Sequence, residues 1–161
     1  MCISSISCVS PMVADPINHR CVTRCTLDPM YFAMPDTKLC GPVCFNSLFA
    51  DNTTGLCVTG CPAPYFGVNT IANYICVQFC PPSQYKHTTS RLCKVNCPSG
   101  TFADPTTMSC VSMCPSIYYG RISDTTCVSD CTPLYRDDIS KHCVSVCPTN
   151  YTANNNSMRC T

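Results

Sequence analysis

The cysteines of this chain are spaced so regularly that they restrict its fold more than any other feature. Nineteen of the 161 residues are cysteine, and sixteen of these form eight pairs with three residues between the two cysteines. Between 11 and 14 residues separate one pair from the next, so the period is about 17 residues. Self-similarity at a fixed period is typical of a linear repeat array. The pairs are Cys21/Cys25, Cys40/Cys44, Cys57/Cys61, Cys76/Cys80, Cys93/Cys97, Cys110/Cys114, Cys127/Cys131 and Cys143/Cys147, and Cys8 and Cys160 extend the same spacing.

The cysteine content indicates a fold held by cross-links rather than by a large apolar core. Nineteen cysteines in 161 residues exceed the roughly 8–10% at which a short chain is typical of a disulfide scaffold. The chain also has 14 prolines and no tryptophan, and no long stretch shows the apolar spacing of a helix. We therefore expect little or no helix.

Each repeat has the same internal order of residue types. Valine usually follows the first cysteine of a pair and proline usually follows the second. Four or five residues after the second cysteine comes an aromatic residue, and then turn formers such as Ala103-Asp104-Pro105. Turn chemistry between two short segments predicts a small hairpin, and the aromatic is expected to pack on its own disulfide and the next hairpin. These aromatics are Phe49, Tyr65, Tyr85, Phe102, Tyr118, Tyr135 and Tyr151.

The pattern C-V-x-x-C-P-x-x-Y, followed by a loop to the next C-V, resembles the furin-like cysteine-rich repeats of growth-factor receptors. It is most similar to their single-disulfide modules, as in cysteine-rich surface proteins of ciliates and other protists. The resemblance covers residues 8–160 and departs from the pattern after Cys8, Cys25, Cys44 and Cys131, where proline is replaced. It implies a small disulfide-rich fold: about nine disulfide-closed β-hairpin modules in a tandem array that forms an elongated rod.

Two disulfide connectivities are compatible with the spacing. Each close pair could bond to itself, or the second cysteine of a pair could reach across its hairpin to the first cysteine of the next pair. The resemblance implies the second connectivity, and a hairpin does return its ends to within disulfide range. The implied bonds are Cys8–Cys21, Cys25–Cys40, Cys44–Cys57, Cys61–Cys76, Cys80–Cys93, Cys97–Cys110, Cys114–Cys127, Cys131–Cys143 and Cys147–Cys160.

This connectivity divides the chain into a lead-in and nine repeats. In each repeat the cysteine that begins the disulfide loop is the opening cysteine, and the one that ends it is the closing cysteine. The lead-in, residues 1–7, contains Cys2, which has the place of a closing cysteine in the pattern and is left unpaired. Its partner is expected upstream, or else in a second chain through a Cys2–Cys2 bond. The repeats span residues 8–24, 25–43, 44–60, 61–79, 80–96, 97–113, 114–130, 131–146 and 147–161.

Metal binding and catalysis are the alternatives to a purely structural array. Two close cysteine pairs could form a zinc site, but that arrangement would leave Cys8 and Cys160 without a role. A catalytic cysteine needs a nearby base, and the histidines, His19, His87 and His142, fall in three different repeats. No motif of paired carboxylates or phosphate-binding glycines occurs. We expect no enzyme activity, no metal and no cofactor.

Two kinds of loop residue suggest further roles. Asp15, Asp51 and Asp104 each lie seven residues after an opening cysteine, where an aspartate is expected to form a turn with its own backbone rather than bind calcium. Asn52, Asn150 and Asn155 begin N-x-S/T sequences on hairpin loops, so they are candidate N-glycosylation sites.

Composition and repetition together favour a secreted structural protein. The net charge is +1, with 12% charged residues, which does not indicate a nucleic-acid partner, and no apolar run is long enough to span a membrane. No signal sequence is visible at the N-terminus. We expect an extracellular or cell-surface segment of a fibre, coat or appendage that self-associates or binds other surface proteins. The alternative is a spacer or dimerisation region of a receptor-like or adhesive ectodomain.

Overall fold

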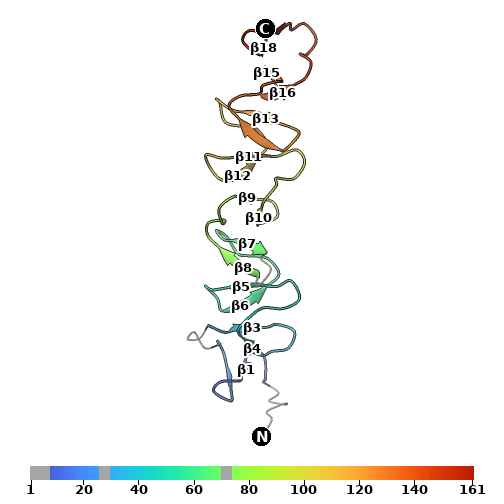
Figure 1. The fold of residues 1–161 in the computed structure, drawn as a ribbon. Coiled ribbons are helices and arrows are strands. Elements are labelled where there is room, and N and C mark those ends of the chain that lie inside the picture. Colours follow the sequence, from blue (N-terminus) through green and yellow to red (C-terminus); the bar gives the residue numbers. More distant parts are fainter. Residues whose placement is uncertain (1–7, 26–29, 70–73) are drawn as a thin grey trace. The chain divides into compact units, whose positions relative to one another are not determined.

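The structure is a computed structural model that describes residues 8–25, 30–69 and 74–161. These residues contain 18 short β-strands and no helix. The strands form nine antiparallel hairpins, numbered here 1 to 9 in chain order (Figure 1). Each hairpin is closed by one disulfide. The fold class predicted from the sequence, a tandem array of small disulfide-closed hairpins without helix, is therefore confirmed.

The chain divides into two compact units, Met1–Phe79 and Cys80–Thr161. The first unit holds hairpins 1 to 4. Their strands are β1 (Val13–Asp15), β2 (Arg20–Val22), β3 (Phe32–Ala33), β4 (Cys40–Gly41), β5 (Phe49–Asp51), β6 (Leu56–Val58), β7 (Phe66–Asn69) and β8 (Tyr74–Val77).

The second unit holds hairpins 5 to 9, which follow the same plan. Their strands are β9 (Tyr85–His87), β10 (Leu92–Lys94), β11 (Phe102–Asp104), β12 (Ser109–Val111), β13 (Tyr119–Arg121), β14 (Thr126–Val128), β15 (Tyr135–Asp137), β16 (His142–Val144), β17 (Ala153–Asn154) and β18 (Arg159–Cys160).

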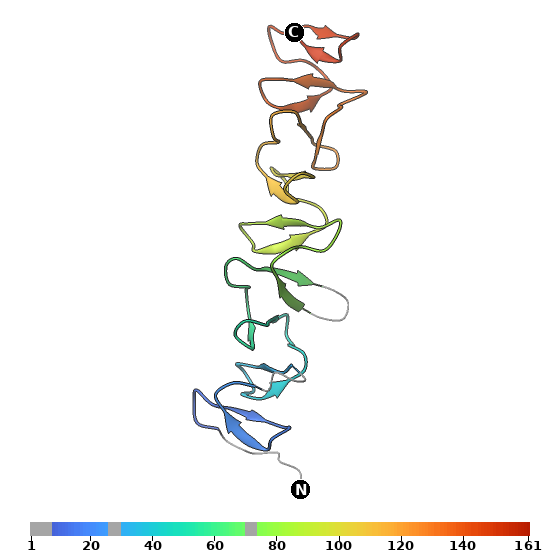
Figure 2. The ribbon, with the colours of Figure 1, turned by 90° about the vertical axis from the view of Figure 1, so that its left-hand side faces the viewer.

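Successive hairpins within a unit point in opposite directions. The first strand of one hairpin pairs in parallel with the second strand of the next, as β11 does with β14 and β13 with β16. Because the two strands of each hairpin are antiparallel, the first strands of neighbouring hairpins must run antiparallel to each other. The loop tips therefore alternate between two sides of each unit, and Figure 2 shows the hairpins from the side.

The hairpin tips owe their shape to one residue with a positive φ. In eight hairpins the residue two places before the closing cysteine has this left-handed conformation, and in all of these except hairpin 2 it ends a four-residue loop. Only Gly55 among these residues is a glycine. The others are His19, Lys38, Arg91, Met108, Thr125, Lys141 and Met158.

A second turn follows the opening cysteine and reverses the chain before the first strand. In most hairpins the N–H of the fourth turn residue donates to the carbonyl of the first, as Thr101 does to Pro98 at 3.0 Å and Tyr118 to Pro115 at 2.8 Å. Proline after the cysteine is thus the first residue of this turn. The turn uses the carbonyl of that residue and needs no N–H from it. Three of these turns contain a cis peptide bond before proline, at Pro11, Pro64 and Pro133.

The nine disulfides occupy all the cysteines that the structure describes. Seven of them join the second cysteine of one close pair to the first cysteine of the next, and Cys8–Cys21 and Cys147–Cys160 follow the same spacing. Each crosses its own hairpin, with Cα–Cα distances of 5.4 to 5.7 Å. A loop of about 15 residues closed in this way is stabilised by roughly 3 kcal/mol in the chain-entropy model. Cys2 lies outside the described residues. Within those residues, the structure contains no helix of the length and apolarity needed to cross a membrane.

Candidate functional site: the contact between neighbouring hairpins

One backbone hydrogen bond recurs between neighbouring hairpins. The carbonyl of the positive-φ residue accepts it from the N–H of the residue opposite the closing cysteine in the first strand of the preceding hairpin. In the first unit, Ala14 donates to Lys38 at 2.8 Å and Ala33 to Gly55 at 2.9 Å. The second unit repeats the contact from Lys86 to Met108, Ala103 to Thr125, Gly120 to Lys141 and Arg136 to Met158, at 2.7 to 2.9 Å. The unusual backbone conformation at the loop tip therefore presents the acceptor that joins the repeats.

Buried rings provide the apolar part of the same contact. Phe102 of hairpin 6 packs against Cys114 and Cys127, which form the disulfide of hairpin 7. Tyr119 of hairpin 7 packs in the same way against Cys131 and Cys143 of hairpin 8. Phe32 and Tyr85 also contact the disulfide of the next hairpin. The disulfides of hairpins 3, 6, 7 and 8 are thus part of small apolar cores that two hairpins share.

This arrangement agrees with the expectation that an aromatic packs on the next hairpin, but the disulfide that Phe102 and Tyr119 contact belongs to that next hairpin rather than to their own. It also changes the identity of two of the buried rings: Phe66 and Tyr119 are buried, whereas their neighbours Tyr65 and Tyr118 are only half-buried. Tyr118 does contact the cluster that includes the disulfide of its own hairpin. In a strand, adjacent side chains point to opposite faces, so a shift of one residue decides which aromatic reaches the neighbour. The cysteine spacing alone did not fix that register.

The residue opposite the closing cysteine is small in seven of the nine hairpins, and in hairpin 7 the neighbouring hairpins lie directly against it. Gly120 is the tightest case: a Cβ at this position would lie 2.7 Å from two ring carbons of Phe102 and 2.9 Å from Cδ2 of His142. The other small residues at this position are Ala14, Ala33, Ala50, Gly67, Ala103 and Ala153. The two exceptions are Lys86 and Arg136, and the Nε of Arg136 is buried without a hydrogen-bond partner.

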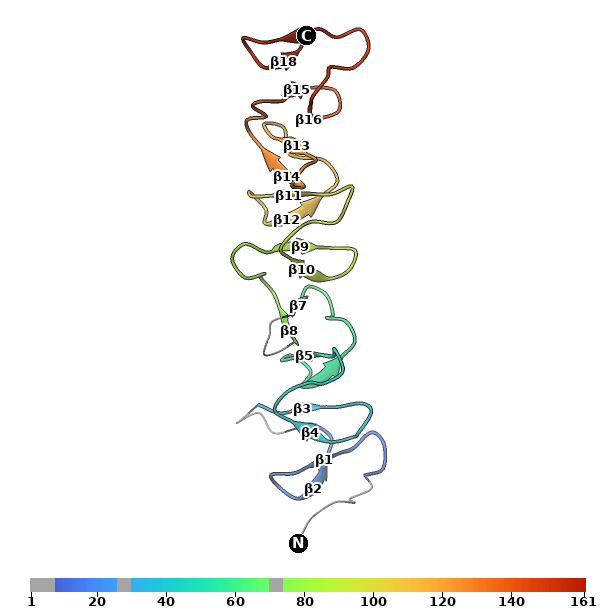
Figure 3. The ribbon, with the colours of Figure 1, turned by 45° about the vertical axis from the view of Figure 1, so that its right-hand side comes forward.

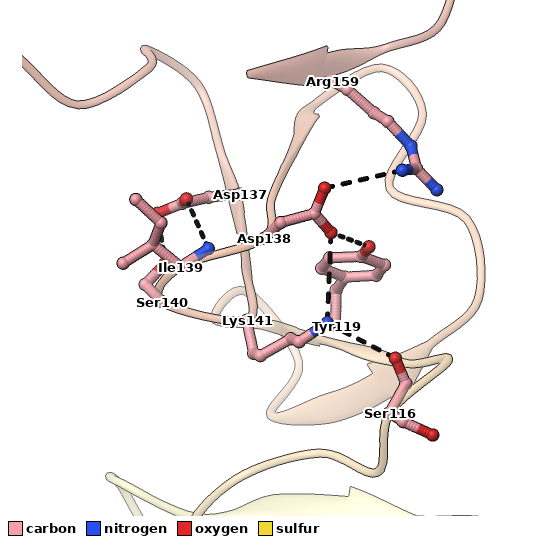
Figure 4. Close-up of polar contacts among 8 residues, drawn as sticks. All are labelled: Ser116, Tyr119, Asp137, Asp138, Ile139, Ser140, Lys141 and Arg159. Atoms are coloured by element: carbon pink, nitrogen blue, oxygen red, sulfur yellow. Dashed lines mark hydrogen bonds and ion pairs between the residues drawn. The ribbon is translucent and has the colours of Figure 1, made fainter. Parts of the chain in front are cut away.

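Two tyrosines add a polar contact to the next loop, and Figure 4 shows the contact of Tyr119. The hydroxyl of Tyr119 donates to the carboxylate of Asp138, the first residue of the loop in hairpin 8. The hydroxyl of Tyr135 donates to Oδ1 of Asn155, the equivalent residue of hairpin 9, at 2.6 Å. The hydrogen bond to Asp138, burial and the negative charge of Asp138 raise the pKa of Tyr119 above 10.0. Where the buried ring is Phe102, the equivalent loop residue is the apolar Ile122.

The carboxylate of Asp138 also draws two cations to the contact. Nζ of Lys141 lies 3.9 Å from one oxygen and Nη1 of Arg159, from hairpin 9, lies 3.5 Å from the other. Lys141 in addition donates to the carbonyl of Ser116 at 3.3 Å and lies 5.1 Å from the centre of the Tyr119 ring (Figure 4). Side chains from three successive hairpins therefore meet at one carboxylate. Because these ion pairs are partly exposed, each contributes at most about 1 kcal/mol.

The aspartates before the loops form turns, as the sequence predicts. Each is nearly fully buried, and its carboxylate accepts the N–H two residues later, at 2.9 Å for Asp15, Asp51 and Asp104. Asp137, which the sequence analysis did not single out, does the same with Ile139 at 3.0 Å. The sequence does contain this aspartate before the loop. The repeat of Asp137 is one residue shorter, so Asp137 lies six rather than seven residues after the opening cysteine.

Hydrogen bonds keep two of these carboxyl groups ionised despite their burial. Burial alone would raise the pKa of Asp51, but hydrogen bonds from Thr53 and Thr54 outweigh it and hold the pKa below the ordinary 3.8. Burial likewise raises the pKa of Asp137, and hydrogen bonds from Ser140 and Ile139 lower it further than burial raises it. All these donors belong to the same loop, so the carboxylates shape their own hairpins and offer no set of oxygens to a cation.

The other candidate residues are distributed along the units. Asn52 and Asn155 are exposed at the same position, the first loop residue, of hairpins 3 and 9, and Asn150 is exposed in the turn before β17 with φ of 74°. The three histidines lie in hairpins 1, 5 and 8. His142 packs its ring 5.2 Å from that of Phe102, and His87 contacts Ser90 at 2.7 Å. Among the described residues, no group of three or more His, Cys, Asp or Glu side chains is placed to hold a metal ion.

Comparison of the chain with protein-family models, with curated proteins and with solved structures yields no match. The description of the chain as a cysteine-rich repeat therefore rests on its own nine disulfides and 18 strands.

Proposed function

We propose that this chain is a structural segment of an extracellular fibre, coat or surface appendage, and that copies of it associate end to end. The repeated, disulfide-closed hairpins are typical of secreted proteins, because disulfides persist in oxidising compartments. Under this proposal the chain acts through its shape and its contacts, without catalysis and without a cofactor. The spacing of the cysteines and the order of residue types around them support a relationship to the single-disulfide furin-like modules.

The observation that carries the proposal is the uniform contact between neighbouring hairpins. The same backbone hydrogen bond is made at six contacts, two in the first unit and four in the second. A contact of this kind has two different faces, one with the free N–H and one with the free carbonyl. Such head-to-tail contacts extend into open assemblies when the two faces lie at opposite ends.

Both faces of this contact are present on the outer strands of the described chain. The carbonyl of His19, beside β2, and the N–H of Ala153, in β17, are the equivalents of the groups that bond inside the units. Neither group has a hydrogen-bond partner among the described residues. Addition of a strand to such an edge is a general way to join proteins.

Substitution at Ala153 tests the proposal directly. Thr152 and Thr161 exchange both hydrogen bonds of their pair, so the N–H of Ala153 points away from its own hairpin. Ala153→Pro removes that N–H without breaking a bond of the hairpin, whereas Ala153→Gly, the matched control, retains it. Analytical ultracentrifugation and electron microscopy of the unreduced chain should show association of the wild type and A153G, and loss of association in A153P. A wild-type chain that stays monomeric over the whole accessible concentration range would refute the proposal.

A monomeric outcome would favour the second function, a spacer in a receptor-like or adhesive ectodomain. The resemblance to growth-factor-receptor modules is what favours it, since such modules hold other domains apart. In either function, the exposed Asn52 and Asn155 are proposed as glycan carriers on the loop tips. The hydrogen bond from Tyr135 uses Oδ1 of Asn155 and leaves Nδ2, the atom that would be glycosylated, available. Mass spectrometry of the natively secreted protein after deglycosylation would test both sites.

A further inference from the structure

The first unit contains a groove of about 260 Å³ beside the contact of hairpins 1 to 3. Its walls are mostly apolar, with the hydroxyl of Ser10 and the ammonium of Lys38 as the polar side-chain groups. The residues that line it are Ser10, Pro11, Met12, Val13, Ala33, Met34, Pro35, Lys38, Leu56 and Cys57. This volume is close to the lower end of the range for small-ligand sites in proteins, about 300 Å³.

The equivalent place in the other unit is filled by a ring of the chain itself. Phe102 of hairpin 6 lies against the backbone of Gly120 in hairpin 7, and its ring lies 5.2 Å from that of His142 in hairpin 8. The ring of Phe102 therefore lies against both of the following hairpins, 7 and 8. Figure 3 shows β11, β13 and β14 in this part of the chain.

Strand pairing shows that Val13, Ala33 and Leu56 of hairpins 1 to 3 are the equivalents of Phe102, Gly120 and His142 in hairpins 6 to 8. Val13 pairs with the residue after its closing cysteine, as Phe102 does. Ala33 lies opposite its closing cysteine and bridges to Leu56, as Gly120 lies opposite Cys127 and bridges to His142. All three residues line the groove.

The next step along the first unit shows what a ring does at this position. Phe32 packs against Ala50 and Ile75, which are again the equivalents in the two following hairpins. A ring occupies the position in seven hairpins, as Phe32, Phe49, Phe66, Tyr85, Phe102, Tyr119 and Tyr135. The side chain of Val13 is too short to reach both of the following hairpins, and the groove is the space that a ring at this position would fill.

We propose that this groove binds an aromatic side chain of a partner protein, one that has an acidic residue next to it. The aromatic character follows from the rings that fill the equivalent positions. Met12 and Met34 add polarisable thioethers, which make favourable contacts with rings. Lys38 makes no ion pair among the described residues, so its ammonium is free to meet an acidic neighbour of the ring.

The backbone around Lys38 holds this rim in place before anything binds. Lys38 has a φ of 53°, its N–H donates to the carbonyl of Met34 at 3.0 Å, and its carbonyl accepts from Ala14 at 2.8 Å. A preformed site loses less conformational entropy when it is filled. The proposal is independent of end-to-end association, because it concerns different residues and a different partner.

A short peptide and methionine-methyl NMR test the proposal on the unreduced full chain. The probe is acetyl-Gly-Phe-Asp-Gly-amide, and the chain carries ¹³C-methyl methionine at its seven Met residues. The ring current of the bound phenylalanine should shift the methyl signals of Met12 and Met34 saturably, with a Kd of about 1 mM or below. The matched peptide with leucine in place of phenylalanine should bind at least about threefold more weakly.

Variants then locate the site and its charge. Val13→Phe should abolish the shifts because the chain's own ring fills the groove, whereas Val9→Phe, at a position 74% exposed, should leave them unchanged. Lys38→Gln should weaken binding of the Asp peptide about two- to fivefold and leave an otherwise identical Asn peptide unaffected. Intermolecular NOEs from the peptide ring to the Val13 methyls of the unmodified chain give a readout that does not depend on the folding of a variant.

Four results would overturn the proposal. These are the absence of saturable shifts at Met12 and Met34, equal affinity for the leucine peptide, binding that persists in V13F, and phenylacetate binding as tightly as the peptide. The last would assign the groove to small aromatic acids rather than to a protein. Shifts that grow with the concentration of the chain alone would assign it to a second copy.

Discussion

Gly120 gives the sharpest test of how neighbouring hairpins hold together. Its backbone conformation is open to other residues, so any effect of Gly120→Ala must come from the added methyl group. That Cβ would lie 2.7 Å from Cε1 and Cζ of Phe102, whereas ordinary contacts begin at 3.4 Å, so the ring must retreat by about 0.7 Å (3.4 minus 2.7). His142 closes the space on the other side at 2.9 Å.

Overpacking of this size destabilises a folded protein by about 1–3 kcal/mol. Replacing glycine also restricts the unfolded chain, which stabilises by about 0.4–1 kcal/mol, so we expect a net loss of about 1–2 kcal/mol. Because repeat arrays need not unfold in one step, amide hydrogen exchange of β13 and β16 in the disulfide-intact chain is the measurement that resolves the loss. Guanidinium unfolding followed by near-ultraviolet circular dichroism gives a second reading.

Two controls separate the steric effect from a general effect of alanine. Gly60→Ala adds a methyl group that meets no atom within 4 Å, so this variant should be neutral or slightly more stable than the wild type. In a Phe102→Leu background the two ring carbons are gone and only the 2.9 Å contact with Cδ2 of His142 remains, so Gly120→Ala should then destabilise less than it does beside the ring. The reasoning is wrong if G120A exchanges as slowly as G60A, or if the loss is as large without the ring as with it.

Three further predictions concern the loops. Asp51 has a pKa lowered below 3.8, so it stabilises hairpin 3 above that pH, and the stability is lost as the pH falls through the folded-state pKa. Asp51→Asn should flatten this acid dependence in amide exchange of the loop, whereas hairpin 9, which has Asn154 at this position, should lack it in the wild type. Tyr119→Phe should remove a phenol of raised pKa from the absorbance titration at alkaline pH, and an unchanged titration would contradict the contact with Asp138. Since the pKa of Tyr119 is raised, its hydrogen bond to Asp138 stabilises below pH 10 and is lost as the pH rises through the folded-state pKa. Met108 has a φ of 51°, so Met108→Gly should raise the free energy of unfolding by up to about 1 kcal/mol, whereas Met108→Val should lower it. Equal thermal stability of the two variants would show that the positive φ does not strain the backbone at this position.

The fold class follows from the sequence because the cysteines leave few alternatives. Their period fixes the number of repeats, and the turn formers between them fix hairpins as the unit, so strands as short as Ala153–Asn154 could be anticipated without any apolar periodicity. The aspartate turns were equally local, since each carboxylate bonds to the N–H two residues further along its own chain. Interactions within one loop of this kind are encoded in a few adjacent residues.

The contacts between hairpins were decided only by the tertiary structure. The sequence did not show that Phe66 and Tyr119, rather than Tyr65 and Tyr118, are the buried rings, because strand register depends on pairing with a neighbour. Nor did it show that Phe102 and Tyr119 rest on the disulfide of the following hairpin, or that Val13, Ala33 and Leu56 come together as a groove. Residues two repeats apart meet only after successive hairpins have stacked in opposite directions, and that stacking depends on hydrogen bonds between backbone groups that every residue type carries.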